Sequence, residues 1–142
     1  MISLFLSQLS GKRFYTKGGW HLFPITEAGS AIRGWHLFPI NRVFTPWEIE
    51  YCGSRKAATQ HYSGRWAAKE AILKAMGTGW AKGIQWTDLE VRNAMGGAPS
   101  VTLSGAAADI CESKGIDEIK ISISHCRLFA TAFAVALGEP TS

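Results

Sequence analysis

The chain has 142 residues, the length of one domain rather than of a multidomain machine. Hydrophobic residues make up 46% of it and charged residues 18%, a composition that supports a folded core and excludes disorder and collagen-like structure. The net charge is +4, and the excess lies in residues 1–47, where Glu27 is the only acid. This asymmetry indicates either an acidic partner or a solvated basic surface. No nucleic-acid-binding motif accompanies it, so we expect no nucleic acid partner.

The cysteines and the hydropathy pattern indicate the compartment. Cys52, Cys111 and Cys126 are odd in number and lack zinc-binding spacing, which predicts reduced, mostly buried thiols in a cytosolic protein. No apolar run approaches the roughly 18 to 20 residues of a membrane-spanning helix. We therefore expect a cytoplasmic protein without a membrane partner.

A seven-residue segment occurs twice near the N-terminus. Gly-Trp-His-Leu-Phe-Pro-Ile stands at 19–25 and returns unchanged at 34–40. Two copies are too few for a solenoid. A paired aromatic binding loop is one interpretation, and a short duplication or a misassigned reading frame is the one we favour. The sequence thus predicts an anomalous segment at 1–40 and a folded domain at 41–142.

Two helices are predicted at the start of this domain. Thr-Pro-Trp-Glu at 45–48 combines a hydroxyl N-cap, a first-turn proline and an acid at capping-box spacing, which predicts a helix from 46 to about 52. A second helix, rich in Ala, Leu, Lys and Glu, is predicted to open at Ser63 or Gly64. Gly77 is its expected left-handed terminator.

A hairpin and a third helix follow. Residues 89–92 and 100–103 alternate in polarity around a turn-rich segment, which predicts a β-hairpin. Ser104 is the expected N-cap of a helix over 105–114, and Gly115 is expected to end it.

The last two elements are predicted strands. Residues 119–124 alternate cleanly and predict a half-buried strand, whereas 128–137 is almost wholly apolar and predicts a central strand buried on both faces. A tight turn at 125–127 joins them. The predicted fold class is α+β, with a meander-like antiparallel sheet packed against helices.

The second helix carries one candidate for chemistry. Glu70 and Lys74 are four residues apart and share a face, which by itself indicates an exposed ion pair. Arg65 and Lys69 add positive charge on the same helix, and the glycines of 77–79 let backbone approach a ligand closely. Together these groups could hold a phosphate and a metal ion.

The end of the 119–124 strand is the second candidate. His125, which follows Ser124, can donate to phosphate oxygens, and Arg127 stands nearby. The alternative is a histidine bonded within its own turn. Helix and strand end form one site only if they meet in space, which sequence spacing does not establish.

Over residues 41–137 these motifs resemble the bacterial holo-acyl-carrier-protein synthases, the small phosphopantetheinyl transferases. The Lys-Glu pair with its trailing Gly-Thr-Gly is highly specific, and the Ser-Ile-Ser-His strand end supports it independently. The similar segments are 42–52, 64–79, 88–91, 97–99, 103–105 and 121–125.

The resemblance implies an Mg²⁺-dependent transfer of 4'-phosphopantetheine from coenzyme A to a serine of apo-acyl carrier protein, in support of fatty acid biosynthesis. It also implies a homotrimer with sites between subunits. Glu70 would be a metal ligand and, with Lys74, a catalytic residue. The substrate-binding residues that it implies are Arg65, Lys69, Gly77, Thr78, Gly79, Ser124 and His125.

The chain departs from the family at its N-terminus. Family members begin with a Gly-Ile-Asp-Ile strand whose aspartate is the second metal ligand. Counting back from Thr45 leads to residues 20–23, and no aspartate precedes Asp88. The alternative function is therefore a catalytically impaired relative that only binds coenzyme A or carrier protein.

Overall fold

The computed structural model describes most of the chain from residue 40 onward and two short strands before it. The described residues are 40–78, 83–126 and 129–139. For the strands at 13–15 and 21–24 only the backbone is described. The repeat at 19–25 and 34–40 falls largely outside them.

The first helix is α1, Pro46–Gly53, as the capping sequence predicts. The amide of Glu48 donates to Thr45 Oγ1 at 3.3 Å, and the amide of Thr45 donates to Glu48 Oε2 at 2.9 Å. Both halves of the capping box are thus formed. A short 3₁₀ turn, Ile40–Arg42, precedes the helix.

The second helix, α2, runs over Ala58–Ala75 and begins before the predicted Ser63 or Gly64. That predicted start is wrong because Gly64 serves packing rather than capping. A Cβ on Gly64 would lie 3.0 Å from Ile123 Cγ2, so the glycine lets α2 approach the sheet closely. The predicted terminator is confirmed, since Gly77 adopts a φ of +70° just beyond the helix.

The predicted hairpin and third helix are confirmed. Strands β3, Leu89–Asn93, and β4, Pro99–Leu103, pair antiparallel, and a 3₁₀ turn at Trp86–Asp88 leads into them. Helix α3 spans Gly105–Ser113 and is followed by Gly115, whose φ is +64°. Ser104 is its N-cap residue, although the serine side chain makes no cap hydrogen bond.

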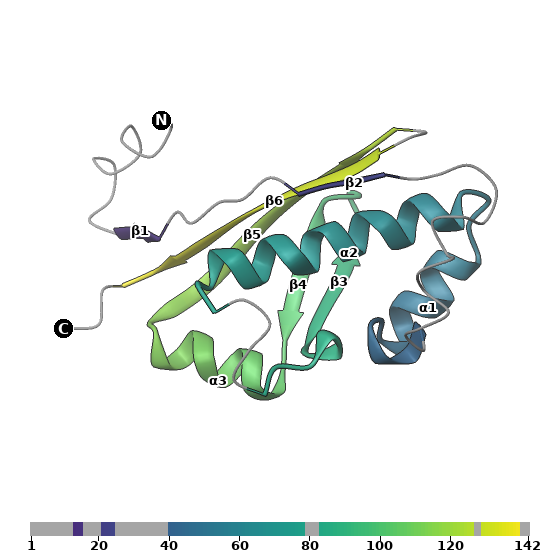
Figure 1. Ribbon diagram of the computed structural model, residues 1–142. Helices are drawn as coiled ribbons and strands as arrows, with labels where there is room; N and C mark the ends of the chain where they lie inside the picture. Colours follow the sequence, from purple (N-terminus) through teal and green to yellow (C-terminus); the bar gives the residue numbers. More distant parts are fainter. Residues whose placement is uncertain (1–12, 16–20, 25–39, 79–82, 127–128, 140–142) are drawn as a thin grey trace.

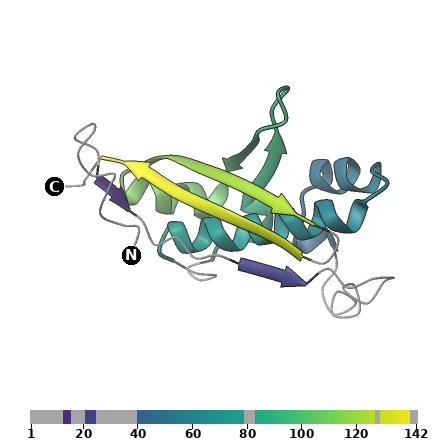
Figure 2. The same cartoon turned by 90° about the horizontal axis from the view of Figure 1, so that it is seen from above.

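The larger sheet is built around one central strand. β6, Phe129–Gly138, pairs antiparallel with β5, Ile116–His125, along one edge. Along its other edge β6 pairs with β1, Arg13–Tyr15, and β2, His21–Pro24. Figure 2 shows β6 lying between β5 and β2. Backbone from the segment that the sequence marks as anomalous therefore belongs to this sheet.

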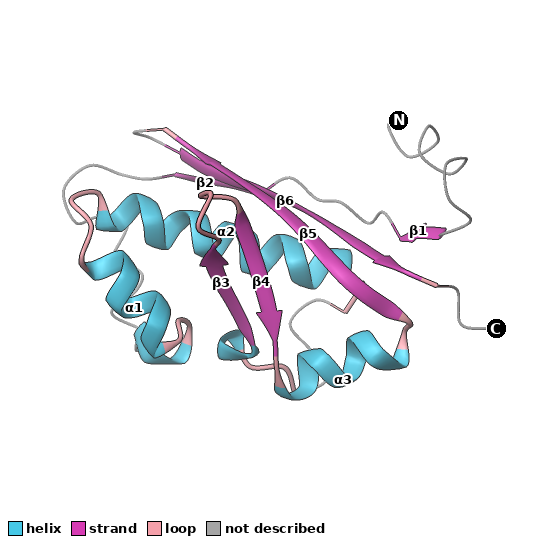
Figure 3. Ribbon diagram, turned by 180° about the vertical axis from the view of Figure 1, so that it is seen from behind, coloured by secondary structure: helices cyan, strands magenta, loops and turns pink. Residues whose placement is uncertain are grey.

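Helix α2 lies along the long strands, with α1 beyond one of its ends and α3 near the other (Figure 1). The hairpin lies beside β5, as Figure 3 shows from behind. Alanines of β6 at 130, 132, 134 and 136 are buried, whereas the residues between them are half-buried. The prediction that this strand is buried on both faces is thus wrong, because one face alone carries the fully buried residues.

Small side chains in this core allow α2 to lie close to β6. The buried alanines of β6 and those of α2 allow helix and strand backbones to approach closely, and Ile72 and Leu73 fill the space between them. Cys52 and Cys111 are also buried, and burial raises the pKa of the Cys52 thiol to about 11. In the described parts of the chain, the helices are too short or too polar to cross a lipid bilayer.

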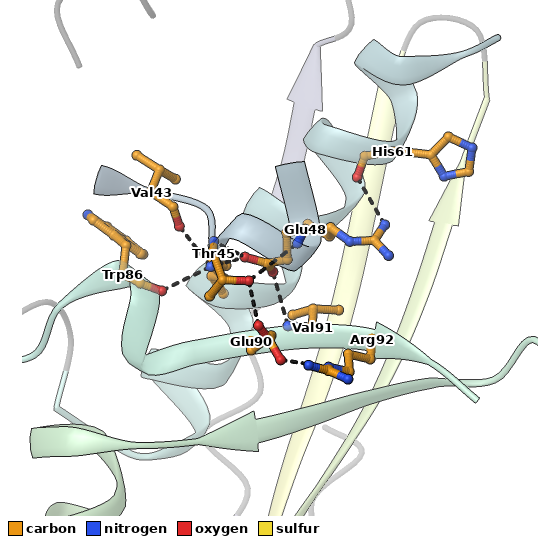
Figure 4. A network of polar contacts seen from close by, with 10 residues as sticks. Val43, Thr45, Glu48, His61, Trp86, Glu90, Val91 and Arg92 are labelled. Carbon is orange, nitrogen blue, oxygen red and sulfur yellow. Dashed lines mark hydrogen bonds and ion pairs between the residues drawn. The ribbon is translucent and has the colours of Figure 1, made fainter. Parts of the chain in front are cut away.

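A buried ion pair joins α1, α2 and β3 (Figure 4). Lys69 and Glu48 are both fully buried, and Lys69 Nζ donates to Glu48 Oε2 at 2.8 Å. The same ammonium donates to the carbonyl oxygens of Val43 at 2.7 Å and Trp86 at 2.9 Å. Glu48 Oε1 accepts the amide of Val91 at 3.0 Å. Burial lowers the pKa of Lys69, and the negative charge of Glu48 opposes that shift.

Replacing Lys69→Met should lower the free energy of unfolding by about 3–5 kcal/mol, because the Glu48 carboxylate is left buried and unpaired. Urea denaturation measures this loss. The double variant Glu48→Gln/Lys69→Met should recover part of it, since the uncompensated charge is gone. Lys56→Met, at an exposed position, should change stability by no more than about 0.5 kcal/mol. Equal losses of unfolding free energy in the Lys69 and Lys56 variants would show that the Glu48–Lys69 ion pair does not stabilise the fold.

Candidate functional site

The predicted helix and the predicted strand end meet at one pocket. This pocket, of about 220 Å³, lies between α1, the first half of α2, the β3–β4 hairpin and the end of β5. Arg65 of α2 and His125 of β5 both line it. His61, Tyr51 and Asn93, which the sequence analysis does not single out, line it too. The described lining residues include no carboxylate.

Contacts within the protein hold the guanidinium of Arg65 in place. The side chain of Arg65 is buried, and its Nη2 donates to Asn93 Oδ1 at 2.8 Å. Its Nη1 lies 3.5 Å from the carbonyl oxygen of His61, and its central carbon lies 4.4 Å from the centroid of the Tyr51 ring. The buried Nε of Arg65 has no hydrogen-bond partner among the described residues. Arg65 is therefore a preoriented cation, and these contacts engage two of its five N–H donors.

Two imidazoles of the pocket lining lie against each other, edge to face. The ring centroids of His61 and His125 are 6.0 Å apart, with an interplanar angle of 65°. His125 and the neighbouring Ser124 are exposed at the end of β5. Burial lowers the pKa of His61, and the positive charges of Arg65, His125 and Arg55 lower it further.

Glu70 and Lys74 lie outside this pocket. Glu70 follows Arg65 by five positions, which turns it about 140° around the helix axis. The carboxylate is half-buried and Lys74 is exposed. The structure thus brings Arg65 and His125 together, and it carries Glu70 and Lys74 on a different face of α2.

Lys69 and the Gly-Thr-Gly segment occupy two further positions. All three N–H donors of Lys69 are engaged inside the protein, so its ammonium does not reach the pocket. Gly77 and Thr78 lie at the far end of α2, about 20 Å along the helix axis from Gly64. There Lys114 Nζ donates to the carbonyl oxygen of Met76 at 2.8 Å. Gly79 lies outside the described residues.

Glu70 is the carboxylate that the family resemblance assigns to a metal ion. Within the described residues, no group of three or more His, Cys, Asp or Glu side chains forms a metal site. β2 contacts α2 and covers most of the positions reached by counting back from Thr45. Its sequence, His-Leu-Phe-Pro, contains no carboxylate. Glu70 therefore fits an Mg²⁺ ion held largely by substrate phosphates and water, which is a common arrangement for this metal.

Comparison with known proteins decides the family. The family model of the 4'-phosphopantetheinyl transferase superfamily matches residues 33–134. A holo-[acyl-carrier-protein] synthase of Ruminiclostridium cellulolyticum is 48% identical over 123 residues, which are 85% of this chain and 92% of the relative. The chain belongs to the holo-[acyl-carrier-protein] synthases. Another, from Desulforudis audaxviator, is 46% identical over 101 residues, 71% of this chain and 76% of its own length.

Solved synthase structures share the fold. The holo-ACP synthase of Plasmodium yoelii superimposes with a TM-score of 0.74 at 28% identity, over 92% of this chain and 99% of that one. The Helicobacter pylori synthase, solved in complex with coenzyme A, gives a TM-score of 0.69 at 26% identity, over 84% of this chain and 98% of that one. The predicted α+β fold and the predicted family are confirmed.

His61 lines the pocket without belonging to any of the predicted motifs. It precedes Arg65 by four positions, and residues at that spacing share a helix face. Because the predicted helix opens at Ser63 or Gly64, His61 falls outside it. A correct helix start at Ala58 indicates that His61 and Arg65 lie side by side.

The lowered pKa of His61 predicts that this synthase loses stability in acid. The folded state binds the His61 proton less readily than the unfolded state does, so protons favour unfolding as the pH falls below about 6.5. The variant His61→Gln should show a shallower decline in the free energy of unfolding between about pH 7 and pH 5. Urea denaturation across that range tests this, and parallel curves for the two proteins would contradict it.

Proposed function

We propose that this synthase transfers 4'-phosphopantetheine from coenzyme A to a serine of apo-acyl carrier protein, and that it serves fatty acid biosynthesis in the cytoplasm. The observation that carries the proposal is the pocket shared by Arg65 and His125 on a synthase fold. The same helix supplies Glu70 and Lys74 on another face. A phosphoryl-transfer reaction needs cations and a carboxylate of this kind, and the family resemblance assigns these four residues to that reaction.

The pocket suits the phosphates of coenzyme A. Arg65 offers a fixed guanidinium, whose planar donors match phosphate oxygens, and His125 adds ring donors at an exposed strand end. The described lining residues bring no negative charge that would repel a phosphate. We assign Ser124, beside His125, to binding of the same phosphate groups.

The serine oxygen of the carrier bonds to one phosphorus of the pyrophosphate while the bond from that phosphorus to the bridging oxygen breaks, so adenosine 3',5'-bisphosphate leaves and the serine proton passes to water. Negative charge spreads over the phosphate oxygens, so positioning and cationic stabilisation supply most of the catalysis. Lys74 neutralises charge on the departing phosphate. Glu70 would hold Mg²⁺, which supplies Lewis-acid stabilisation of the pyrophosphate when bound. The resemblance assigns Gly77, Thr78 and Gly79 to binding of the same substrate.

Lys69 takes a different role from the one that the resemblance implies. Its ammonium is fully buried and all of its protons are donated inside the protein. We therefore assign Lys69 to positioning: it fixes α2, and with it Arg65 and Glu70, against α1 and β3.

We further propose that the working enzyme is a homotrimer with composite sites. Support comes from the different faces of α2 that carry the Arg65–His125 pocket and the Glu70–Lys74 pair. A neighbouring subunit that sets its own Glu70 against this pocket completes one site from two half-sites. Each interface in a closed ring is of this head-to-tail kind.

Incubation with coenzyme A, Mg²⁺ and an apo-acyl carrier protein should add the mass of phosphopantetheine to the carrier, which intact-protein mass spectrometry measures. The variant Glu70→Gln should lower kcat/KM by about 100-fold, because several kcal/mol of charge stabilisation are lost with the metal ligand. Coenzyme A binding without transfer by the wild type would favour the impaired relative, which the absent aspartate motivates.

Mixing of inactive variants tests the composite site. Glu70→Gln and His125→Ala should each be nearly inactive, yet co-expression should restore about one quarter of the wild-type sites, since random mixing reunites two intact half-sites in that proportion. Co-expression of Glu70→Gln with Lys74→Ala is the matched control. Both changes damage the same half-site, so no recovery is expected. Failure of the first mixture to recover would place the whole site within one chain.

A further inference from the structure

The pocket contains a second imidazole, that of His61, which the proposed reaction does not use. His61 stands on α2 one turn before Arg65, and its ring faces His125 of β5 with 6.0 Å between centroids. On its other side the ring meets Tyr51 of α1 edge-on, with centroids 5.8 Å apart. The imidazole is thus held between α1 and β5 at the wall of the pocket.

The groups that face His61 are cationic or neutral. Arg65 approaches from α2, Arg55 from the segment after α1, and His125 from β5. The hairpin contributes the uncharged Asn93, Gly97 and Pro99 to the pocket wall, and Tyr51 comes from α1. No described carboxylate lines the pocket to balance these charges.

Such surroundings favour the neutral form of the imidazole while the pocket is empty. Burial and the neighbouring positive charges both lower the pKa of His61, because each makes the protonated ring more costly. The position is nevertheless within reach of any anion that contacts Arg65 and His125. A bound phosphate reverses the sign of the local charge, and a negative neighbour favours an imidazolium.

We infer that His61 takes up a proton from solvent when a phosphate group enters the pocket, and that it thereby acts as a third recognition group beside Arg65 and His125. The inference rests on the proposed function, since it takes coenzyme A as the phosphate carrier. In the free protein the ring is neutral near pH 7, and in the complex it is an imidazolium that donates to a phosphate oxygen.

Proton uptake makes binding dependent on pH. Between the pKa values of His61 in the free and bound protein, each binding event consumes up to about one proton, and the affinity rises by up to about tenfold for each unit by which the pH falls. The pKa of His61 in the free protein lies below its usual value, so near pH 7 the free ring is largely neutral, and binding takes up protons as far as the phosphate raises that pKa.

Calorimetric titration of the wild-type protein with coenzyme A at pH 7, in buffers of different ionisation enthalpy, measures the protons taken up. We expect the variant His61→Gln to bind more weakly and to take up fewer protons, by up to about one for each site. Thr59→Ala, on α2 but outside the pocket wall, should match the wild type in proton uptake. Comparison of variants cancels protons that the ligand itself gains or loses. Adenosine 3',5'-bisphosphate as a second probe should reproduce the difference.

A second measurement does not depend on a variant. In NMR titrations of the wild type, the pKa of the His61 ring should rise above 6.5 when coenzyme A is bound. Equal proton uptake by wild type and His61→Gln, or an unshifted His61 titration in the complex, would overturn the inference and leave the proposed function standing. Failure of the wild type to bind coenzyme A at all would overturn both.

Discussion

The buried ion pair between Glu48 and Lys69 is the constraint on which the site depends. It joins α1, α2 and β3 through bonds that leave no donor of Lys69 unused. A helix is a rigid rod, so turning Lys69 inward fixes the direction of every other side chain on α2. Arg65, one turn earlier, is thereby directed to Tyr51 and Asn93. Glu70, the next residue, is turned about 100° away. The ion pair thus decides which face of α2 meets the pocket, and helix geometry then turns Glu70, the proposed metal ligand, away from it.

Local sequence signals predict the elements that local interactions build. The capping box of α1, the left-handed Gly77 and the hairpin need only neighbouring residues, and all three are predicted correctly. The first turns of α2 are different, because Ala57 offers no side-chain cap. They are supported from outside, as where Tyr62 Oη donates to the carbonyl oxygen of Ile49. A start signal in the sequence does not exist for such a helix.

The site is predictable only in part, for a related reason. Motif residues reveal Arg65 and His125, but the burial of Lys69 depends on Glu48, which lies 21 positions away and reads as an ordinary capping residue. Charged residues are almost never fully buried without a partner, so sequence alone favours an exposed Lys69. Packing likewise determines that one face of α2 presents Arg65 to the pocket and another carries Glu70 and Lys74. Strands β1 and β2 show the same limit, because pairing with β6 determines their place and their own sequence does not predict it.

Charge at the pocket differs from charge along the chain. The excess of basic residues lies before residue 48, whereas Arg65 and the two imidazoles of the pocket come from the balanced remainder. The rigid placement of the Arg65 guanidinium keeps its positive charge at the pocket. A flexible lysine in place of Arg65 would swing toward water when the pocket is empty and relieve the repulsion on His61. Asn93 and Tyr51 prevent that movement for the guanidinium. The repulsion therefore persists until an anion arrives, and a fixed arginine is the feature that makes His61 responsive to phosphate.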